Sequence, residues 1–265
     1  MKNNICSRLE DNIKTTKSIY IVCEGKNSEP IYLREYINLL VRKINEKQIN
    51  NFAIIDPGVD FQKFKITIPC TDNNGNELER IEINIKHIDK TDPINIINNG
   101  REQAKENNYV FCIFDKDGHV DGRKERYNEA IKTKVEENVK KINSVPFFEY
   151  FIRLHFEYNT SEEYCNGPSD NFIKNILNKR LHLKYTKKTR DFYIFFKKNL
   201  KDKIMTAIKN SQKLKNENLS EPITNFHILL IELFKIITEK IEDNNYKTKN
   251  KNNDEILKIM EKILK

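Results

Sequence analysis

The sequence lacks several features that would assign the chain to a familiar class. It contains no C-x-x-C pair, which argues against the common zinc modules, and no G-x-x-x-x-G-K-[ST] loop, so any ATPase activity would have to come from a partner. The longest apolar stretch, residues 228–234, is too short to span a bilayer and includes an acid. Residues 1–10 carry no apolar segment of the type found in signal peptides. We therefore expect a soluble cytoplasmic protein without membrane contact.

Cysteine is scarce and scattered along the chain. The five cysteines are odd in number and none lies close to another. Cys23 and Cys112 fall inside apolar runs that have the character of core strands, so buried, reduced thiols are expected.

The chain of 265 residues is long enough for a substantial core, although only 38% of it is hydrophobic and 32% is charged. Its net charge of +8 is unevenly distributed: residues 174–217 contain fourteen Lys or Arg and three acids, a local charge of +11. This asymmetry favours a polyanion that is bound by one part of the chain and processed by the other. The alternative is a set of solvated lysine faces on ordinary helices.

Acidic residues follow two apolar runs. Glu24 ends the run 18–23, and Asp115 and Asp117 end the run 109–114. Both runs are short, uncharged and rich in β-branched and aromatic residues, as in strands buried on both faces of a parallel sheet. The carboxyl ends of such strands form the ligand-binding crevice of open α/β sheets. Three carboxylates gathered there would repel one another without a cation, so the pattern predicts a Mg²⁺ or Mn²⁺ site that acts on phosphates.

The remaining pattern predicts an α/β fold followed by helices. Ser28 and Pro30 have the character of a helix start, and alternating residues in 64–88 around the turn 72–76 predict an antiparallel hairpin, either inserted in the sheet or extending its edge. Further elements are predicted as helices at 92–107, 121–140 and 147–156, a short strand at 141–144, and helices at about 169–180, 190–200, 201–216, 222–241 and 253–264. No strand pattern follows residue 161. Gly167-Pro168 favours a division near this point, into an α/β domain at 1–160 and a basic helical domain at 161–265.

The order of these motifs resembles that of a known fold. Glu24-Gly25 after one strand and Asp115-x-Asp117 after a later one resemble the TOPRIM fold of topoisomerases, bacterial primases and overcoming-lysogenization-defect (OLD) nucleases. Beyond this, the chain resembles RloB or AbiLii-type proteins. The matching segments are 21–25 with 28–30, 114–117, 144–149 with 154–156, and Pro222-x-Thr224-x-x-His227. A primase or topoisomerase role is disfavoured because no zinc module and no sizeable domain for a nucleophilic tyrosine is present.

The resemblance implies a TOPRIM-like, mainly parallel sheet flanked by helices, and a nuclease-like subunit of a bacterial anti-phage or abortive-infection system. It also implies an ATPase partner of the OLD or structural-maintenance-of-chromosomes type. By this resemblance Glu24 corresponds to an acid/base residue or metal ligand, and Asp115 and Asp117 to metal ligands. Glu29 corresponds to a second acid of the first motif, at a spacing that differs from the OLD pattern. The binding of one metal ion and the binding of two therefore remain as alternatives.

Other residues are weaker candidates. Glu149 lies in an apolar helix, where it would either complete a second metal site or interact with the helix dipole. His155, in the same helix, is better explained as a core histidine bonded to a carbonyl. Lys116 and His119 flank the acids and would contact a phosphate, or be solvated loop residues. The segment 184–193, with Lys184, Lys187, Lys188, Arg190, Phe192 and Tyr193, combines bases with aromatic rings, as in nucleic-acid-binding strips or in surface helices with a buried aromatic side.

Two functions follow as hypotheses. The first is a metal-dependent phosphodiesterase that cuts DNA or RNA in a defence response. The second is a non-catalytic module that binds nucleic acid or an ATPase partner. The three intact strand-end acids favour the first, because a purely structural domain has no need to bury them together.

Overall fold

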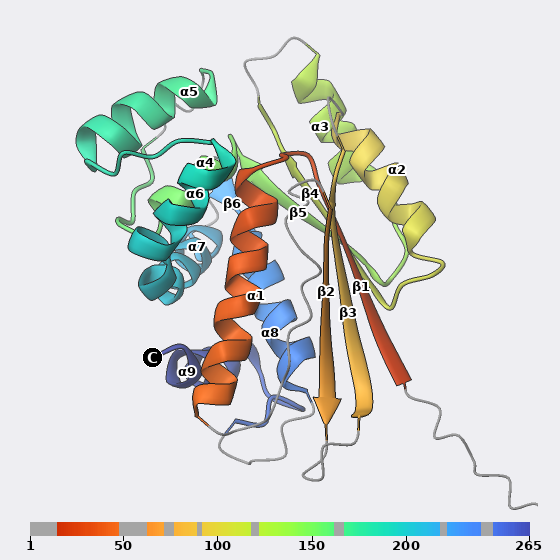
Figure 1. The fold of residues 1–265 in the computed structure, drawn as a ribbon. Coiled ribbons are helices and arrows are strands. Elements are labelled where there is room, and N and C mark those ends of the chain that lie inside the picture. The colour runs from red at the N-terminus through yellow and green to blue at the C-terminus, as the bar shows by residue number, and fades with distance from the viewer. Residues whose placement is uncertain are drawn as a thin grey trace, which may run out of the picture.

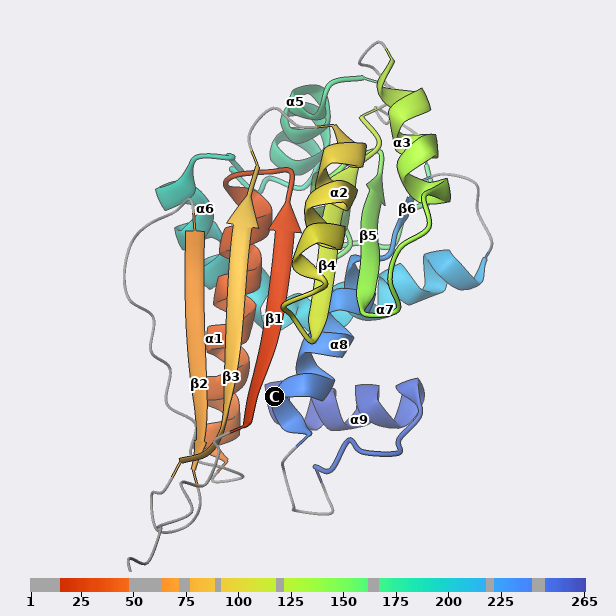
Figure 2. The same ribbon diagram turned by 90° about the vertical axis from the view of Figure 1, so that its right-hand side faces the viewer.

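A six-stranded mixed sheet forms the centre of the molecule (Figure 2). The computed structural model describes residues 15–47, 63–71, 77–88, 92–117, 122–161, 167–217, 222–239 and 246–265. The strands are β1 (Thr15–Cys23), β2 (Lys63–Thr71), β3 (Glu77–His87), β4 (Tyr109–Asp115), β5 (Val139–Val145) and β6 (Ile223–Thr224), in the order β2-β3-β1-β4-β5-β6. The four central strands are parallel, and the two edge strands β2 and β6 are antiparallel to their neighbours. The predicted mainly parallel α/β architecture is confirmed.

The second half of β1, residues 19–23, and most of β4, residues 109–114, are apolar because both faces of these segments are covered. On β1, Ile19, Ile21 and Cys23 belong to one hydrophobic cluster, whereas Tyr20 and Val22 belong to a second cluster on the opposite face. Side chains of a strand alternate between the two faces of its sheet, so an uninterrupted apolar sequence is needed wherever both faces are packed.

Helices cover each face (Figure 1). Helices α1 (Ser28–Glu46) and α8 (Phe226–Thr238) pack on one face, and α2 (Pro93–Gln103) and α3 (Arg123–Lys132) on the other. A Cβ at Gly100 would lie 2.2 Å from the Sγ of Cys112, so the absence of a side chain allows α2 to pack tightly on β4. Cys23 and Cys112 are both buried and free, as predicted.

The predicted hairpin is formed by β2 and β3 and extends the sheet beyond β1. Strand β3 pairs with β1 in parallel and with β2 in antiparallel orientation. Alternating residues of the pair, including Ile66, Ile83 and Ile85, face the core that lies under α1. The predicted turn at 72–76 lies outside the described residues.

Several predicted boundaries are wrong. The helix expected at 121–140 ends at Lys132, and β5 begins at Val139, two residues earlier than expected. The side-chain amide of Asn138 donates to the carbonyls of Ala104 and Asn107, at 2.9 and 2.8 Å, and so fixes the start of β5 beside the loop that precedes β4. The dense run of charges in 121–140 is typical of a surface helix, but charges alone carry no information on where pairing with β4 begins.

A strand also occurs where none was expected. Ile223 and Thr224 form β6 against Val145 and Ser144, and α8 therefore starts at Phe226 and not at 222. The side chain of Asn225 continues this pairing: its Oδ1 accepts from the backbone N–H of Asn143 at 2.6 Å, and its Nδ2 donates to the carbonyl of Lys141 at 3.2 Å. An amide side chain thus takes the place of further strand residues along the edge of β5.

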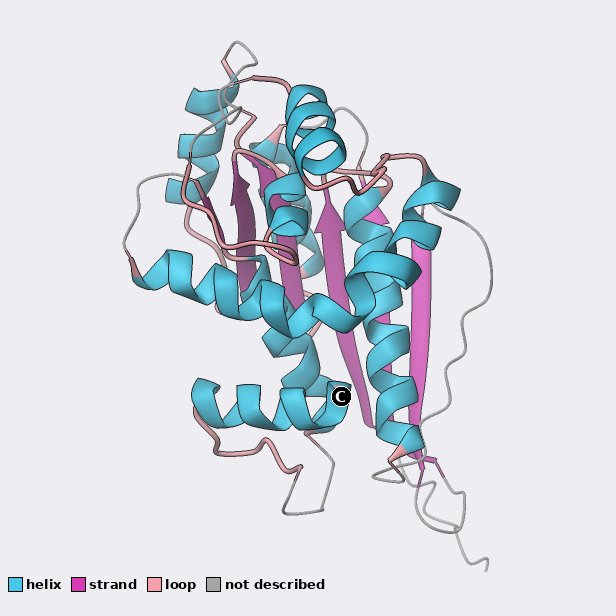
Figure 3. Ribbon diagram, turned by 90° about the vertical axis from the view of Figure 1, so that its left-hand side faces the viewer, coloured by secondary structure: helices cyan, strands magenta, loops and turns pink. Residues whose placement is uncertain are grey.

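The C-terminal helices stack on the face of the sheet that carries α1 (Figure 3). The segments are α4 (Phe148–Arg153), α5 (Ser169–Phe172) running into the π-helical η1 (Ile173–Arg180), α6 (Thr189–Phe195) running into η2 (Phe196–Leu200), η3 (Lys201–Lys203), α7 (Ile204–Asn216) and α9 (Asn253–Leu264). Their bounds agree with the predicted helices, except that α4 is shorter than 147–156. None of the helices within the described ranges is both long enough and apolar enough to cross a membrane.

The predicted division at residue 160 remains a prediction. One hydrophobic cluster contains residues from Ile19 to Ile263, and β6 joins the sheet from beyond the proposed boundary. A buried polar pair also links α1 to the segment after α4. The Nε2 of His155 lies 2.9 Å from the hydroxyl of Tyr32, and its Nδ1 lies 3.1 Å from the carbonyl of Phe151, in agreement with a core histidine.

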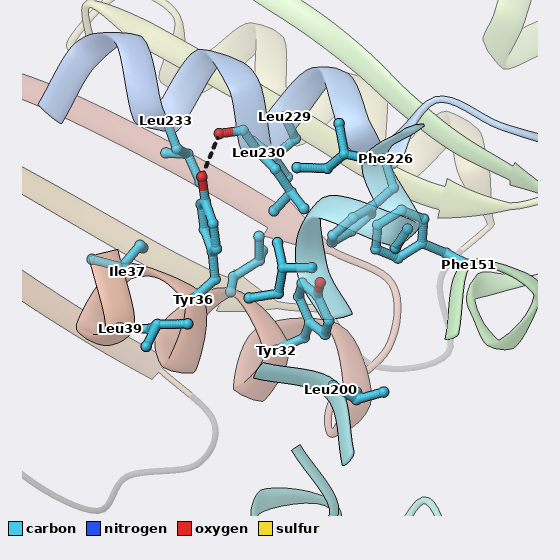
Figure 4. Packing of buried hydrophobic residues seen from close by; sticks show 14 of the residues in the cluster. Tyr32, Tyr36, Ile37, Leu39, Phe151, Leu200, Phe226, Leu229, Leu230 and Leu233 are labelled. Carbon is cyan, nitrogen blue, oxygen red and sulfur yellow. Dashed lines mark hydrogen bonds between the residues drawn. The ribbon is translucent and has the colours of Figure 1, made fainter. Parts of the chain in front are cut away.

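Tyr36 links α1 to α8 and provides a test of this packing (Figure 4). Its buried hydroxyl donates to the carbonyl of Leu230 at 2.9 Å. We expect Tyr36→Phe to lower the free energy of unfolding by about 1 kcal/mol through the lost hydrogen bond. Tyr36→Ala should cost about 3–5 kcal/mol, because it also leaves a cavity. Urea denaturation measures both values, and the exposed Tyr193, changed to Phe, is the control. Equal stability of Tyr36→Phe and wild type would contradict the role of this bond.

Candidate metal and nucleic-acid site

The carboxyl ends of β1 and β4 bring the predicted acids together. The backbone pairing continues past the end of β1, since the N–H of Glu24 donates to the carbonyl of Ile113 at 3.1 Å. The carboxylate of Glu24 then accepts from the N–H of Asp115 at 3.3 Å. Two acids that are 91 residues apart in sequence are therefore direct neighbours.

A pocket of about 260 Å³ opens at this end of the sheet. Its lining includes five carboxylates, namely Glu24, Glu29, Asp115, Asp117 and Glu149. These are the five residues that the sequence proposed as metal ligands, and they come from four separate segments of the chain. Whether they bind a metal stays a prediction.

Glu29 enters the pocket from the first turn of α1. A Cβ on Gly25 would lie 2.2–2.5 Å from the carboxylate of Glu29, so the glycine after β1 makes room for this acid. The predicted helix start is shifted by one residue: Asn27 precedes the helix, and Ser28 is its first member. Burial, followed by the neighbouring Glu149, raises the pKa of Glu29 to about 8.

The two aspartates are also held by the backbone around them. The Oδ2 of Asp115 accepts from the N–H of Phe148 at 3.1 Å, so this carboxylate satisfies one free donor at the start of α4. Asp117 has a φ of 43°, in the left-handed region that Asp and Asn tolerate better than most residues. Its N–H donates to the carbonyl of Pro146 at 3.0 Å, which fixes the loop between the two acids beside the β5–α4 connection.

Glu149 on α4 is held by two side chains of the segment that precedes α6. Its Oε1 accepts from the hydroxyl of Tyr185 at 3.1 Å and lies 3.2 Å from the Nζ of Lys187. Burial, followed by the Glu149 charge, raises the pKa of Tyr185, so its hydroxyl stays protonated and donates. The hydroxyl of Ser28, 3.1 Å from that of Tyr185, then serves as donor to it.

Arg123 is a pocket neighbour that the sequence did not indicate. Its guanidinium group, on the first residue of α3, pairs with the carboxylate of Glu24 and lies 3.4 Å from the carbonyl of Asp115. Arg123 stands in a helix where charged residues predominate, and no pattern distinguishes it from its neighbours. Only the folded position of α3 at the end of β4 reveals it.

The electrostatics of the pocket are dominated by carboxylate crowding. Burial raises the pKa of Asp115 well above its usual range, and the charges of Glu29, Asp117, Glu24 and Glu149 add to this effect. Burial also raises the pKa of Glu24, although Arg123 opposes it. For Lys187, burial disfavours the charge, but Glu149 and Glu29 outweigh it and raise the pKa. The crowded acids of the pocket therefore favour the binding of protons or cations.

The donor set fits a hard divalent cation, because it consists of carboxylate oxygens. Among the described residues, however, no three His, Cys, Asp or Glu side chains converge in an arrangement that would hold a metal. Glu24 is turned to Arg123 and Glu149 to Lys187. To bind a metal through its carboxylate, each of these two acids would have to exchange its protein cation for the ion.

The proposed nucleic-acid contacts separate into three groups. Lys184, Lys188 and Arg190 are exposed, whereas Lys187 lines the carboxylate pocket. Of the accompanying rings, Tyr193 is exposed and Phe192 is buried in the core, so Phe192 is not available for stacking on bases. Lys116 lies between the aspartates but does not line the pocket, and His119 lies outside the described residues.

Comparison with known proteins gives one result. No curated protein and no solved structure matches the chain significantly. A family model described as "RloB-like protein" matches residues 19–233, which include most of β1, all five pocket acids and β6. The match covers well over half of the sequence and confirms the resemblance to RloB-like proteins. The chain thus belongs to the RloB-like protein family.

Proposed function

We propose that this protein is a metal-dependent nuclease subunit of a bacterial anti-phage or abortive-infection system, with a TOPRIM-type site. The observation that supports it best is the gathering of five carboxylates in one pocket at the carboxyl ends of parallel strands. Membership of the RloB-like family is compatible with a role in defence. An ATPase of the OLD or structural-maintenance-of-chromosomes type is the expected partner, since the sequence has no P-loop of its own.

Glu24, Asp115 and Asp117 would hold Mg²⁺ or Mn²⁺, and Glu29 with Glu149 would hold a second ion. A bound divalent cation neutralises charge on the phosphate and lowers the pKa of a coordinated water. Within the protein, Glu24 is suited to carry a proton, because burial raises its pKa. Arg123 fixes the orientation of the Glu24 carboxylate through their ion pair.

The rival function is a non-catalytic module that binds nucleic acid or the ATPase partner. It is favoured by the ion pairs of Glu24 with Arg123 and of Glu149 with Lys187, which already neutralise two of the pocket acids. Under this hypothesis the acids serve to position basic groups, and a divalent cation has no role.

The two functions are separated by a cleavage assay with Mg²⁺ or Mn²⁺ on single- and double-stranded DNA, tRNA and other RNA. Under the nuclease hypothesis, wild type should cut at least one substrate, EDTA should stop the reaction, and Glu24→Gln should reduce its rate while keeping the shape of the side chain. Because the subunit can be inactive without its partner, the assay is repeated with any ATPase encoded beside it. Binding without cleavage under all these conditions would favour the rival.

The exposed basic strip makes a separate prediction about binding. Reversing the charges of Lys184, Lys188 and Arg190 should weaken nucleic-acid binding and flatten its salt dependence, by about one unit of slope for each phosphate that the variant no longer binds. Fluorescence anisotropy at several salt concentrations measures both. The matched control reverses the charges of three exposed lysines that lie more than 50 residues after the strip in sequence, Lys247, Lys249 and Lys258. Equal effects in both triple variants would assign the weakening to net charge alone.

A further inference from the structure

Lys187 connects the helical region to the carboxylate pocket. Its Nζ is 3.2 Å from the Oε1 of Glu149 and donates to the Oγ of Ser169 at 2.8 Å. The Glu149 side chain is 4% exposed, whereas that of Lys187 is 42% exposed. The Lys187 side chain therefore reaches a buried carboxylate of the pocket while part of its length is accessible to solvent.

The segment that carries Lys187 is fixed on both sides. Asn178 of η1 holds the backbone of Tyr185, donating to its carbonyl at 2.9 Å and accepting from its N–H. Thr189, at the start of α6, donates to the Oδ1 of Asn27 beside α1 at 2.9 Å. Both flanks of Lys187 are attached to neighbouring elements. Its side chain can therefore contact only groups that lie close to its present position.

A second hollow, of about 360 Å³, is also lined by Lys187. Lys187 lines both this hollow and the carboxylate pocket. The hollow is also lined by Lys174, Lys188 and Thr186, with Asp170 as its acid. Lys174 and Lys188 are exposed. An acidic pocket and a basic hollow thus adjoin, and one lysine belongs to both.

These contacts limit what the ammonium group can do at one time. While it neutralises Glu149, it offers little charge to an anion in the hollow. A divalent cation bound to Glu149 would repel the ammonium group and take its place as counter-ion, and Lys187 would then be free to contact an anion in the hollow. Three lysines around such a hollow would attract an anion of the phosphate class.

We propose that the hollow beside the carboxylate pocket is a second phosphate subsite for a nucleic-acid strand, and that Lys187 couples it to cation binding by moving from Glu149 to the strand's phosphate. This inference rests on the proposed function for the identity of the ligand. It requires positive coupling: the cation strengthens nucleic-acid binding, and nucleic acid strengthens cation binding by the same factor.

The test measures binding and not cleavage. Labelled single-stranded DNA and RNA oligonucleotides with phosphorothioate linkages, which resist cutting, are titrated with and without Mn²⁺. Calorimetry gives the affinity for Mn²⁺ alone. In wild type we expect Mn²⁺ to tighten oligonucleotide binding by about 5- to 150-fold, the usual range of coupling between sites. In Lys187→Gln, which keeps most of the length of the side chain, this factor should fall towards one.

Two further results distinguish coupling from a merely structural role. Mn²⁺ alone should bind Lys187→Gln more tightly than wild type, because a competing ammonium group is gone. Glu149→Gln should bind the oligonucleotide more tightly than wild type without Mn²⁺, because Lys187 is then released. Lys188→Gln is the matched control: it should weaken oligonucleotide binding and leave the coupling factor unchanged.

Wild-type coupling in Lys187→Gln, or weaker binding of Mn²⁺ by this variant, would overturn the inference. The failure of the proposed function has a different signature. A wild-type protein that couples Mn²⁺ to the oligonucleotide but cuts no substrate, alone or with an ATPase encoded beside it, would refute nuclease activity and leave the role of Lys187 intact.

Discussion

Asp115→Asn and Asp117→Asn should each lower metal-dependent cleavage by about 10²-fold or more, the usual loss when a group that stabilises transition-state charge is removed. Both acids line the pocket, and the neutral amide is a weak ligand for a hard cation. Asparagine is preferred to alanine for structural reasons. Its Oδ1 still accepts from the N–H of Phe148 in place of Asp115, and it tolerates the φ of 43° at position 117.

Folding must be measured in parallel, because a lost activity is informative only in an intact protein. Carboxylate crowding destabilises the metal-free pocket, so we expect both asparagine variants to unfold at the same denaturant concentration as wild type or at a slightly higher one. Asp115→Ala should be less stable than Asp115→Asn by about 1 kcal/mol, since it removes the acceptor at the start of α4. Asparagine variants that remain fully active would refute the metal hypothesis.

Glu29→Gln should make the metal-free protein more stable at pH 8 and leave its stability unchanged near pH 4. The pKa of Glu29 is about 8 in the folded protein and near 4.5 when the carboxyl is unperturbed. A carboxyl whose pKa is raised by folding stabilises the fold below its unfolded pKa, and this contribution is lost as the pH rises through the folded value. The advantage of the glutamine variant should therefore grow between pH 4.5 and 8, by at most about 1.4 kcal/mol per pH unit.

Two buried histidines have the opposite effect on the pH dependence of stability. For this reason the test compares the stability of the variant with that of wild type. Burial lowers the pKa of His155 to about 3 and that of His227 to about 4. Each stays neutral in the fold and protonates on unfolding, so both reduce stability as the pH falls below about 6.5. This contribution is common to wild type and Glu29→Gln, and it cancels in their difference.

The second part of this test measures how a divalent cation changes the stability of the same variants. At pH 8 Mn²⁺ should raise the melting temperature of wild type more than that of Glu29→Gln, because a ligand that binds only the folded state stabilises it by mass action. Glu35→Gln is the control, since Glu35 is a buried acid of the same helix that pairs with Lys197 outside the pocket. Equal pH dependence of the two glutamine variants would show that crowding around Glu29 is unimportant.

The sequence predicted what depends on local pattern. The two-sided burial of β1 and β4 follows from their uninterrupted apolar runs, and the convergence of Glu24 with Asp115 follows from the parallel pairing of those strands. The gathering of Glu29 and Glu149 in the same pocket is indicated by the family resemblance more than by spacing. Membership of the RloB-like family is confirmed by the family model.

What escaped prediction depends on contacts between distant segments. Arg123 is a charged residue among many, and only the packing of α3 places it on Glu24. The sequence groups Lys187 with its exposed neighbours, because nothing local shows that its side chain turns towards Glu149. Strand β6 has two residues, too few for any alternation to be recognised, and the edge of β5 selects it.

The late position of β6 in the chain has a consequence for folding during synthesis. Ribosomes release β1 to β5 first, whereas Ile223, Thr224 and Asn225 emerge some eighty residues after the strand they cover. Until then the outer edge of β5 offers unpaired backbone groups to any other extended chain. A nascent chain interrupted before residue 222 would present a sheet with an uncovered side, which is a state that aggregates or attracts chaperones. Translation of residues 223–225 is thus the step after which the outer edge of β5 can be covered.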